Sequence, residues 1–430
     1  MAGAAVSAPV TVVGVDGGPL VPAATKALAD ARFVVGWPRH VAAVRDTLPA
    51  GARVEVVDAD LDATLAALDA APRPAVVLSS GDPGYFGVVR ALRARGHDLV
   101  VVPAVSSVAT AFAAAGVAWD DAHVVSAHGR PPHRALAVCR RFPKVAVLTE
   151  PAFGPAEIGA ALAGLGRQLV VAERLGHDDE RITRLPAEDA LHRTWADPNV
   201  VVVLDPAAEP AGRGWSAPPR ASATRWALDD ASFDHRAGMI TKAEVRALAL
   251  AWLGPGPGDL VWDVGAGSGA VAVEAARLGA AVVAVDADPD ALARTAANAR
   301  RHGVPVEVVT GRAPGALALL PDPDAVFVGG GGQALPAILD AAAARASRCV
   351  VVALATLERV SPTLAALAGA GLDVRATQLS AARLAPLGAG HRLAAQNPVV
   401  LVAGHRPADP PAQTSRRAAG GDEPPNGSPP

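Results

Sequence analysis

A glycine-rich turn between an apolar run and a predicted helix is the stretch of the sequence best suited to binding a ligand. Residues 261–269 read Val-Trp-Asp-Val-Gly-Ala-Gly-Ser-Gly, and Asp286 follows Gly265 by 21 positions, at the end of the next apolar run. A glycine turn lets the backbone approach a nucleotide, and an acidic side chain at the end of the second strand can accept hydrogen bonds from a ribose diol. The pattern therefore predicts a nucleoside-binding site.

The spacing of the glycines bears on which nucleoside would bind. The loop has the form G-x-G-x-G, whereas dinucleotide enzymes carry G-x-G-x-x-G, whose third glycine has the spacing that accommodates a pyrophosphate. S-adenosylmethionine (SAM) is therefore a better candidate than NAD. An NAD-dependent dehydrogenase and an ordinary strand-to-helix turn remain alternatives. The expected SAM contacts in this region are Gly265, Ala266, Gly267, Ser268, Gly269 and Asp286.

The elements that must position this loop form an alternating pattern along the chain. Short Val- and Leu-rich runs are separated by Ala- and Leu-rich helical segments, which predicts an α/β fold in both halves. In the first half we expect strands over residues 10–13, 33–35, 54–57, 75–78, 98–102, 144–148, 169–172 and 200–204. In the second half we expect strands over residues 260–264, 281–285, 306–309, 325–328, 349–353, 374–379 and 399–402. The last two have no helix between them, which predicts an antiparallel pair at one edge.

The length of 430 residues favours two or three domains. We expect one domain over residues 8–206, a Pro-, Ala-, Gly- and Ser-rich linker over 207–232, and a second domain over 233–405. Residues 406–430 are polar and rich in Pro and Gly, which predicts a disordered tail.

Composition argues against several classes of protein. The net charge of −3 and the lack of a basic block give no electrostatic footprint for nucleic acid or for an anionic membrane. No apolar run approaches the roughly 18 residues of a membrane span. Cys139 and Cys349 are far apart and outside any metal-ligand spacing, so we expect two buried thiols, no metal and a cytoplasmic location. Arginine carries nearly all the positive charge and is suited to gripping carboxylates.

Five ordered motifs in the second half carry a resemblance to a known family. They are residues 239–246 (MITKAEVR), 262–269 (WDVGAGSG), 311–314 (GRAP), 324–330 (DAVFVGG) and 397–399 (NPV). Together they resemble the C-terminal half of the decarboxylating precorrin-6Y methyltransferases, which implies a Rossmann-like class I SAM methyltransferase. The resemblance implies SAM contacts at Thr241, Ala313 and the loop and acid already named. Thr241 and Glu244 also have the spacing of a capping box at a helix start.

A second set of motifs covers the first half. Residues 10–20 (VTVVGVDGGPL), 79–87 (SSGDPGYFG), 103–107 (PAVSS), 119–122 (WDDA) and 126–130 (SAHGR) follow in order. They are similar to the tetrapyrrole methylase family, whose fold consists of two α/β subdomains. This likeness implies a second SAM site at Gly81, Asp82, Ser106 and Ser107, in a loop where Asp82 can form an Asx turn. The first turn departs from the usual G-x-G-P-G of the family.

The two resemblances together imply one reaction sequence. It is SAM-dependent methylation of precorrin-6B at carbons 5 and 15, with loss of carbon dioxide from the ring C acetate, to give precorrin-8x. The C-terminal unit would handle carbon 15 and the decarboxylation, and the N-terminal unit carbon 5. A cobalt-containing substrate and a scaffold that binds a tetrapyrrole without turnover remain alternatives.

Basic side chains near the expected clefts are candidates for the carboxylates of such a substrate. They are Arg383, His391 and Arg392 in the second half and His128 and Arg130 in the first. Each could equally be a solvated surface residue. Related units commonly form dimers or tetramers, so a homo-oligomer is expected.

Overall fold

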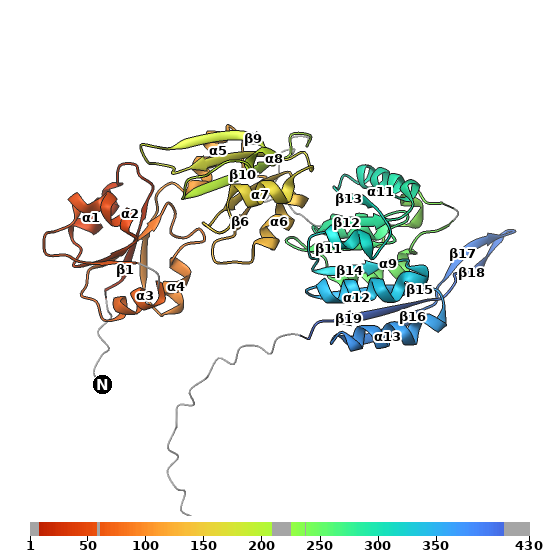
Figure 1. The fold of residues 1–430 in the computed structure, drawn as a ribbon. Helices are drawn as coiled ribbons and strands as arrows, with labels where there is room; N and C mark the ends of the chain where they lie inside the picture. Colours follow the sequence, from red (N-terminus) through yellow and green to blue (C-terminus); the bar gives the residue numbers. More distant parts are fainter. Residues whose placement is uncertain (1–7, 58–60, 209–224, 237, 408–430) are drawn as a thin grey trace, which may run out of the picture.

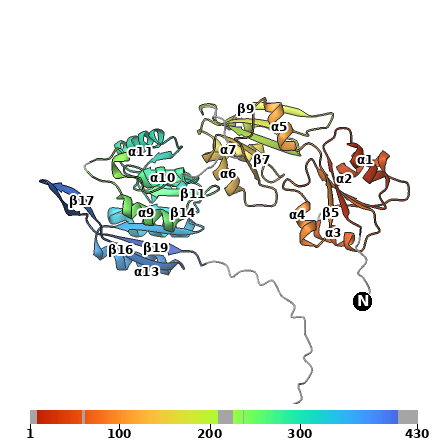
Figure 2. The same ribbon diagram turned by 180° about the vertical axis from the view of Figure 1, so that it is seen from behind.

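The computed structural model describes residues 8–57, 61–208, 225–236 and 238–407. These residues form three bodies in a row, two belonging to the N-terminal half and one to the C-terminal half, with the second body in the middle (Figures 1 and 2). Most of the expected linker and nearly all of the expected tail lie outside the described residues.

The first body contains a parallel sheet in the order β3 (Arg53–Val56), β2 (Phe33–Gly36), β4 (Ala75–Ser80), β1 (Val10–Val15) and β5 (Leu99–Val102). Its helices are α1 (Pro22–Ala29), α2 (Pro38–Val44), α3 (Leu61–Asp69) and α4 (Val89–Ala94), with a 3-10 turn η1 (Arg45–Thr47). Side chains of β1 alternate between two hydrophobic clusters, one on each face of the sheet. Burial on both faces explains why its strands read as continuous apolar runs.

The second body contains a mostly antiparallel sheet in the order β6 (His123–Ser126), β7 (Lys144–Leu148), β10 (Asn199–Leu204), β8 (Gln168–Glu173) and β9 (Arg181–Pro186). Helices α5 (Ser107–Ala115), α6 (Pro132–Arg141), α7 (Pro155–Leu162) and α8 (Ala187–Ala190) complete it. Strands β6 and β9 were not predicted from the sequence. Both are edge strands, and β9 buries only Leu185, so neither has a strong apolar pattern.

The third body is built on a seven-stranded sheet. Its order is β13 (Glu307–Thr310), β12 (Ala281–Asp286), β11 (Leu260–Val264), β14 (Ala325–Val328), β15 (Cys349–Leu354), β19 (Val399–His405) and β16 (Asp373–Leu379). The helices are α9 (Ala243–Leu253), α10 (Ala270–Arg277), α11 (Pro289–Arg301), α12 (Leu335–Arg345) and α13 (Val360–Gly369), with 3-10 turns η2 (Asp230–Ser232), η3 (Gly315–Leu319), η4 (Gly332–Ala334) and η5 (Leu357–Arg359). Strands β16 and β19 pair antiparallel at one edge, which confirms that prediction.

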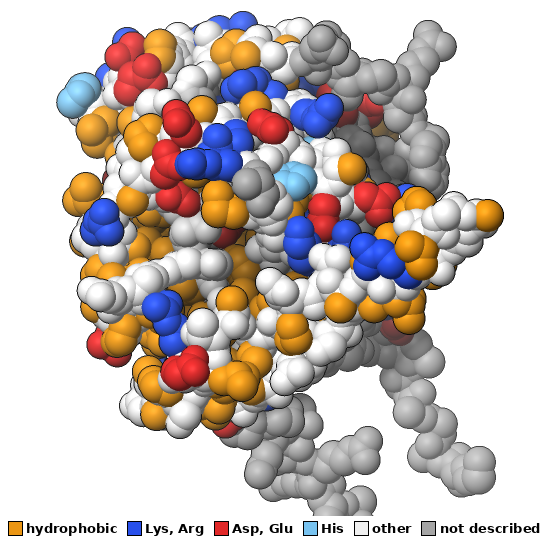
Figure 3. Space-filling view, turned by 90° about the vertical axis from the view of Figure 1, so that its right-hand side faces the viewer, with side chains coloured by type: hydrophobic (Ala, Val, Ile, Leu, Met, Phe, Trp, Pro, Cys, Tyr) orange, Lys and Arg blue, Asp and Glu red, His pale blue; other side chains and the backbone are white. Residues whose placement is uncertain are grey.

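A hairpin of β17 (Ala382–Leu387) and β18 (Gly390–Ala395) projects from the third body at the end remote from the N-terminal half (Figures 1 and 2). It was not predicted, because its residues are almost all exposed and so lack the buried face that gives a strand its pattern. Leu384, Leu387 and Leu393 are 73%, 60% and 68% exposed. Figure 3 views this end and shows hydrophobic side chains together with Lys and Arg at the surface.

The helix that precedes β11 corrects one local prediction. Helix α9 begins at Ala243 after Lys242, without a side-chain cap from Thr241, so the predicted capping box is wrong. The backbone N–H of Ala243 instead donates to Asp230 Oδ1 at 3.0 Å. The Glu244 carboxylate points elsewhere and binds Arg383. A residue from a different segment thus replaces the local cap.

None of the helices in the described ranges is long and apolar enough to span a membrane.

Candidate cofactor sites

The three glycines of the loop after β11 have different surroundings. Gly265, Gly267 and Gly269 all have positive φ angles, of 73°, 59° and 69°. A Cβ atom on Gly265 would lie 2.9 Å from the backbone nitrogen of Gly330, and one on Gly269 would lie 2.5 Å from the side chain of Thr295. A Cβ atom on Gly267 would meet nothing within 4 Å. Gly267 is therefore the glycine of this loop that leaves open space for a ligand.

Asp286 at the end of β12 is half-buried and holds the loop from the neighbouring strand. Its Oδ2 accepts a hydrogen bond from Gly267 N at 3.0 Å, and its Oδ1 accepts one from Asp288 N at 3.0 Å. Each carboxylate oxygen has a second acceptor position. The side chain can thus support the loop and still receive hydrogen bonds from a ribose.

The loop after β13 adjoins the same acid. Gly311 N donates to the Asp286 backbone carbonyl at 2.9 Å, which holds the start of this loop against the end of β12. Ala313 is half-buried and packs on the hydrophobic cluster beneath the sheet. On the other side of β11, Gly329 N donates to Val264 O at 2.9 Å. The motifs predicted from successive strand ends therefore meet at the carboxyl ends of the parallel strands. We call this side of the sheet the cofactor edge.

A buried carboxyl group lies beneath the glycine loop. Asp263 is the charged residue inside the apolar strand β11, and it is only 2% exposed. Burial raises the pKa of Asp263 to about 7, a hydrogen bond from Ala272 N at 3.0 Å opposes this, and the charge of Asp286 raises the pKa further. Because Ala272 belongs to α10, this hydrogen bond ties the helix to the strand before it.

Thr241 is positioned by a buried ion pair that sequence reasoning did not find. Arg246 on α9 and Glu274 on α10 have fully buried side chains, with Nε and Oε1 2.6 Å apart. Arg246 also donates to the carbonyls of Thr241 and Leu228, and Glu274 accepts from Leu228 N at 3.0 Å and from Ala227 N. The pair therefore fixes residues 227–228 and Thr241 against α9 and α10. Such a buried charge pair holds a segment firmly only when its partners are satisfied, as here.

Arg383, at the base of the hairpin, is bound by two carboxylates. Its Nη2 lies 2.6 Å from Glu244 Oε2, and its Nη1 lies 2.9 Å from Asp230 Oδ2. The hydrogen bonds to Glu244 and Asp230 raise the pKa of Arg383 above its ordinary value. The structure thus assigns Arg383 an anchoring contact for the hairpin, and its contact with a substrate stays a prediction. His391 and Arg392 lie exposed on β18.

The expected N-terminal site lies where β1 and β4 end side by side. Gly81 has a φ of 54°, its N donates to Val15 O at 2.8 Å, and its carbonyl accepts from Ala104 N at 3.2 Å. A Cβ atom on Gly81 would lie 2.9 Å from Val105 O. Asp82 Oδ1 accepts from Gly84 N at 2.8 Å, which confirms the predicted Asx turn. The loops that carry these motifs are therefore in contact.

The two serines of this site lie at the start of α5. Ser106 is its N-cap, and its Oγ accepts from Ala109 N at 3.1 Å, while Ser107 is the first helical residue. Asp16 Oδ2 accepts from Val105 N at 3.1 Å, so the divergent first turn reaches the same loop. These contacts explain the serine at position 106 structurally, and its contact with SAM stays a prediction.

Arg130 comes from the second body but reaches the loop of the first. Its guanidinium lies over the Phe86 ring, 5.5 Å from the ring centre. His128 is exposed beside it. The geometry brings Arg130 to the boundary of the two subdomains, where a cationic group could meet a substrate carboxylate.

His40 and Arg39 on α2 both contact the Ser80 hydroxyl, at 2.9 and 3.0 Å. Neither was predicted from the sequence as a site residue. Burial, together with the Arg39 charge, lowers the pKa of His40 to about 4, so His40 is neutral at pH 7. This cluster fixes the end of β4 next to Gly81. The sequence carried no motif for it, because residues 39–40 and 80 belong to separate elements.

Two family models match the chain. Residues 231–406 match the precorrin methyltransferase domain, and residues 11–191 match the tetrapyrrole (corrin/porphyrin) methylases. A probable cobalt-precorrin-6B C(15)-methyltransferase (decarboxylating) from Pyrobaculum calidifontis is 43% identical over 182 residues, which cover 41% of this chain and 93% of the relative. The chain belongs to the decarboxylating precorrin methyltransferase family.

A longer relative aligns with parts of both halves. A decarboxylating precorrin-6Y C(5,15)-methyltransferase from Sinorhizobium sp is 39% identical over 269 residues, which cover 60% of this chain and 63% of the relative. The matched part thus spans less than two thirds of that relative's length. The solved structure of a precorrin-6y C5,15-methyltransferase from Geobacter metallireducens GS-15 is 30% identical and covers 42% of this chain and 98% of its own, with a TM-score of 0.40.

Membership of this family bears on one of the alternatives left open above. The family is one of methyltransferases, which excludes the NAD-dependent dehydrogenase. A methyltransferase family also agrees with the G-x-G-x-G spacing, which was the reason to prefer SAM to NAD.

Proposed function

We propose that this chain methylates precorrin-6B at carbons 5 and 15 with SAM and removes carbon dioxide from the ring C acetate, giving precorrin-8x. The observation that carries the proposal is the pair of separate glycine-built sites on one chain, one at residues 265–269 and one at Gly81. The name of the Sinorhizobium relative supports methylation at both carbons with decarboxylation, and that of the Pyrobaculum relative supports the carbon-15 step. A substrate methylated at two carbons gives both sites a use.

Two features of the cofactor edge of the third body support SAM as its ligand. Gly267 leaves open space, and Asp286 offers acceptors beside it. SAM supplies an activated methyl group on a sulfonium, and the electron-rich meso carbon of the tetrapyrrole is the nucleophile. The residues of the chain act by aligning the two and by excluding water. We propose contacts with SAM at Thr241, residues 265–269, Asp286 and Ala313.

In the decarboxylation, the conjugated pyrrole beside the acetate accepts the electron pair released with carbon dioxide, and a proton from water then completes the methyl group that replaces the acetate. The protein must hold the other carboxylates while leaving the reacting acetate poorly solvated. His391, Arg392 and Arg383 are the proposed carboxylate partners in the third body. We propose His128 and Arg130 for the N-terminal cleft, with SAM held at Gly81, Asp82, Ser106 and Ser107.

A second candidate substrate is the cobalt-containing macrocycle, which the Pyrobaculum relative's name specifies for the carbon-15 reaction. The same edge would serve it, since the methylated carbon and the acetate are common to both.

We further propose that the chain works as a homo-oligomer in the cytoplasm. The leucines exposed on the β17–β18 hairpin support self-association, because burial of each such side chain contributes about 1.5–3 kcal/mol. The free thiols of Cys139 and Cys349 suit a reducing compartment.

Incubation of the chain with precorrin-6B and SAM tests the proposal. Mass spectrometry should show the gain of two methyl groups and the loss of carbon dioxide. A parallel thermal-shift assay should show stabilisation by SAM and none by NAD. A product that keeps every carboxylate would overturn the decarboxylating function, and SAM consumption without tetrapyrrole methylation would overturn the substrate.

A further inference from the structure

The N-terminal half contacts the third body through helix α6. This helix buries Val138 and Cys139 in its own subdomain, but Ala137 is 2% exposed and belongs to the hydrophobic cluster that contains Leu260. The two halves thus share a small apolar contact.

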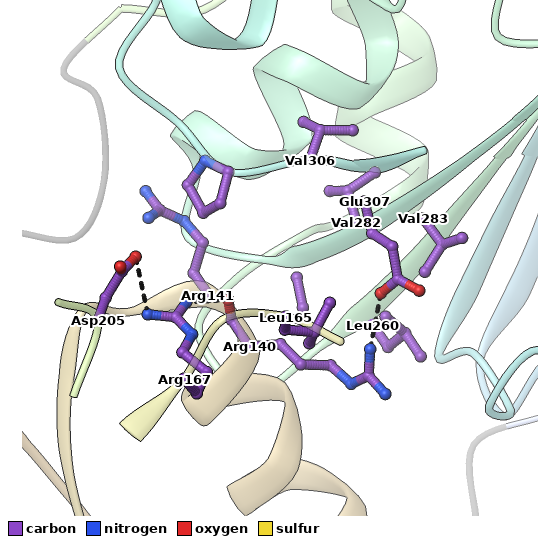
Figure 4. Close-up of a pocket in the computed structure, with 12 residues that line it drawn as sticks. Arg140, Arg141, Leu165, Arg167, Asp205, Leu260, Val282, Val283, Val306 and Glu307 are labelled. Atoms are coloured by element: carbon purple, nitrogen blue, oxygen red, sulfur yellow. Dashed lines mark hydrogen bonds and ion pairs between the residues drawn. The ribbon is translucent and has the colours of Figure 1, made fainter. Parts of the chain in front are cut away.

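Polar contacts surround this apolar one. Arg140 Nη1 lies 2.7 Å from Glu307 Oε2, and Arg141 Nε donates to Ala276 O at 2.8 Å. A cavity of about 180 Å³ lies between the halves, and Figure 4 shows arginines from one side facing valines and Glu307 from the other. Arg167 steadies the cluster by donating to Arg140 O at 2.7 Å and pairing with Asp205 at 3.0 Å.

These contacts fall on the edge of the sheet opposite the cofactor edge. Leu260 and Glu307 are the first residues of β11 and β13, and Ala276 is near the end of α10, which runs back from the glycine loop. The cofactor edge begins where β11 ends, at Val264, about 13 Å from Leu260 at roughly 3.3 Å per residue. Packed core fills that distance, because all five residues of β11 are buried.

The hairpin confirms the direction in which the cofactor edge faces. It leaves the sheet between the end of β16 and the start of β19, and it projects away from the N-terminal half in both views (Figures 1 and 2). The proposed N-terminal site lies on the far side of the second body, at the boundary with the first. One whole subdomain and the length of the sheet therefore separate the two sites.

We propose that the singly methylated tetrapyrrole leaves one site and crosses solvent before it enters the other, because in the described part of one chain a packed subdomain and the buried sheet lie between the two sites. A domain swing that brought the sites together would have to break the Arg140–Glu307 pair and expose Ala137. This inference rests on the proposed function, and it makes the chain a fusion of two independent methyl-transfer catalysts.

Isotope dilution on the wild-type protein tests this inference. The singly methylated intermediate is first collected with unlabelled SAM from reactions stopped before completion. It is then added in excess to the wild-type protein, together with precorrin-6B and SAM that carries a ¹³C-methyl group. Release predicts that the newly made ¹³C-labelled intermediate mixes with the unlabelled pool, so that product with two labels appears only after a lag and falls in proportion to the added pool. Retention predicts that product with two labels forms without a lag, in step with the consumption of precorrin-6B, and this result would overturn the inference.

The control separates this result from failure of the proposed function. The wild-type protein without added intermediate must yield product with two labelled methyl groups, and its absence would count against the function itself.

A variant at the interface adds a second readout. Glu307→Gln weakens the ion pair with Arg140 at the edge opposite the cofactor. Release predicts unchanged single-label fractions and unchanged rates of both methylations. A several-fold change in the ratio of the two methylation rates would indicate that the interface takes part in transfer, and would overturn the inference.

Discussion

The turn at residues 14–18 and the turn at residues 265–269 are both rich in glycine, but their glycines have different roles. In the first turn, a Cβ atom on Gly17 would lie 2.1 Å from Gly176 O, and one on Gly14 would lie 2.0 Å from Gly81 O. In the second, Gly267 faces open space. Glycine thus permits close packing of loops at the first turn, and it leaves room for a ligand at one position of the second. Substitutions should separate these roles.

The largest effect is expected at Gly17. Valine there would collide with the backbone of Gly176 at a φ of 85°, so we expect Gly17→Val to destabilise the N-terminal half by more than about 3 kcal/mol. Thermal unfolding should show it, with methylation at carbon 15 retained. Gly18→Ala is the matched control, since its Cβ atom would meet only the Asp16 side chain, at 3.3 Å. Equal stability of the two variants would contradict the packing role.

Gly81 is closely packed and belongs to the proposed N-terminal site, so its substitution should abolish one activity. Gly81→Val places a branched side chain 2.9 Å from Val105 O at positive φ, so we expect methylation at carbon 5 to stop. The product methylated at carbon 15 and decarboxylated should accumulate.

Circular dichroism must show that the Gly81→Val protein folds, and Gly116→Val supplies the control. Gly116 also has a positive φ, of 68°, but a Cβ atom there would meet nothing within 4 Å. A folded Gly81→Val protein that still makes doubly methylated product would remove this loop from the site.

A side chain at position 267 should leave the fold intact but block the binding of SAM. Gly267→Trp fills the open space, and we expect the affinity of the third body for SAM to fall at least about 100-fold, or roughly 2.7 kcal/mol. Gly254→Trp carries the same backbone strain, with a φ of 57°, at the other edge of the sheet and should bind SAM normally. Titration calorimetry measures both. Similar losses in the two variants would mean that strain, and not the ligand space, causes the effect.

Asp286 should give the smallest change. Loss of its carboxylate removes acceptors for the ribose, so Asp286→Ala should weaken SAM binding by about 1.5–3 kcal/mol. Asp286→Asn keeps one oxygen, and it should fall between the alanine variant and the wild type. Methylation by the N-terminal unit should not change in either variant. Equal losses at both sites would show a coupling between the halves that their separation does not suggest.

Much of the fold could be predicted because most strands are buried on both faces. The runs at 260–264, 281–285 and 349–353 are almost continuously apolar, and each became a strand at nearly the predicted bounds. The β17–β18 hairpin could not be predicted, since it has no buried face to impose a pattern.

The place where the C-terminal motifs meet could be predicted, because parallel strands bring their carboxyl ends to one side of the sheet. The contacts that hold it could not. Arg383 and Asp230 are 153 positions apart, and Arg246 meets Glu274 only once α9 and α10 have packed together. No local spacing encodes such pairs, which is also why Glu244 was assigned to the wrong partner.

Helix α6 docks on the third body at the edge opposite the cofactor edge. This position bears on how such a chain could arise by gene fusion. A partner attached at that edge covers only strand beginnings, so joining it there disturbs no residue proposed to touch SAM. The Pyrobaculum relative matches 41% of this chain over 93% of its own length, so it is much shorter than the whole chain. Recombination could therefore replace the N-terminal half while changing little more than the contacts of Ala137, Arg140 and Arg141. The residues proposed to bind SAM would stay unchanged.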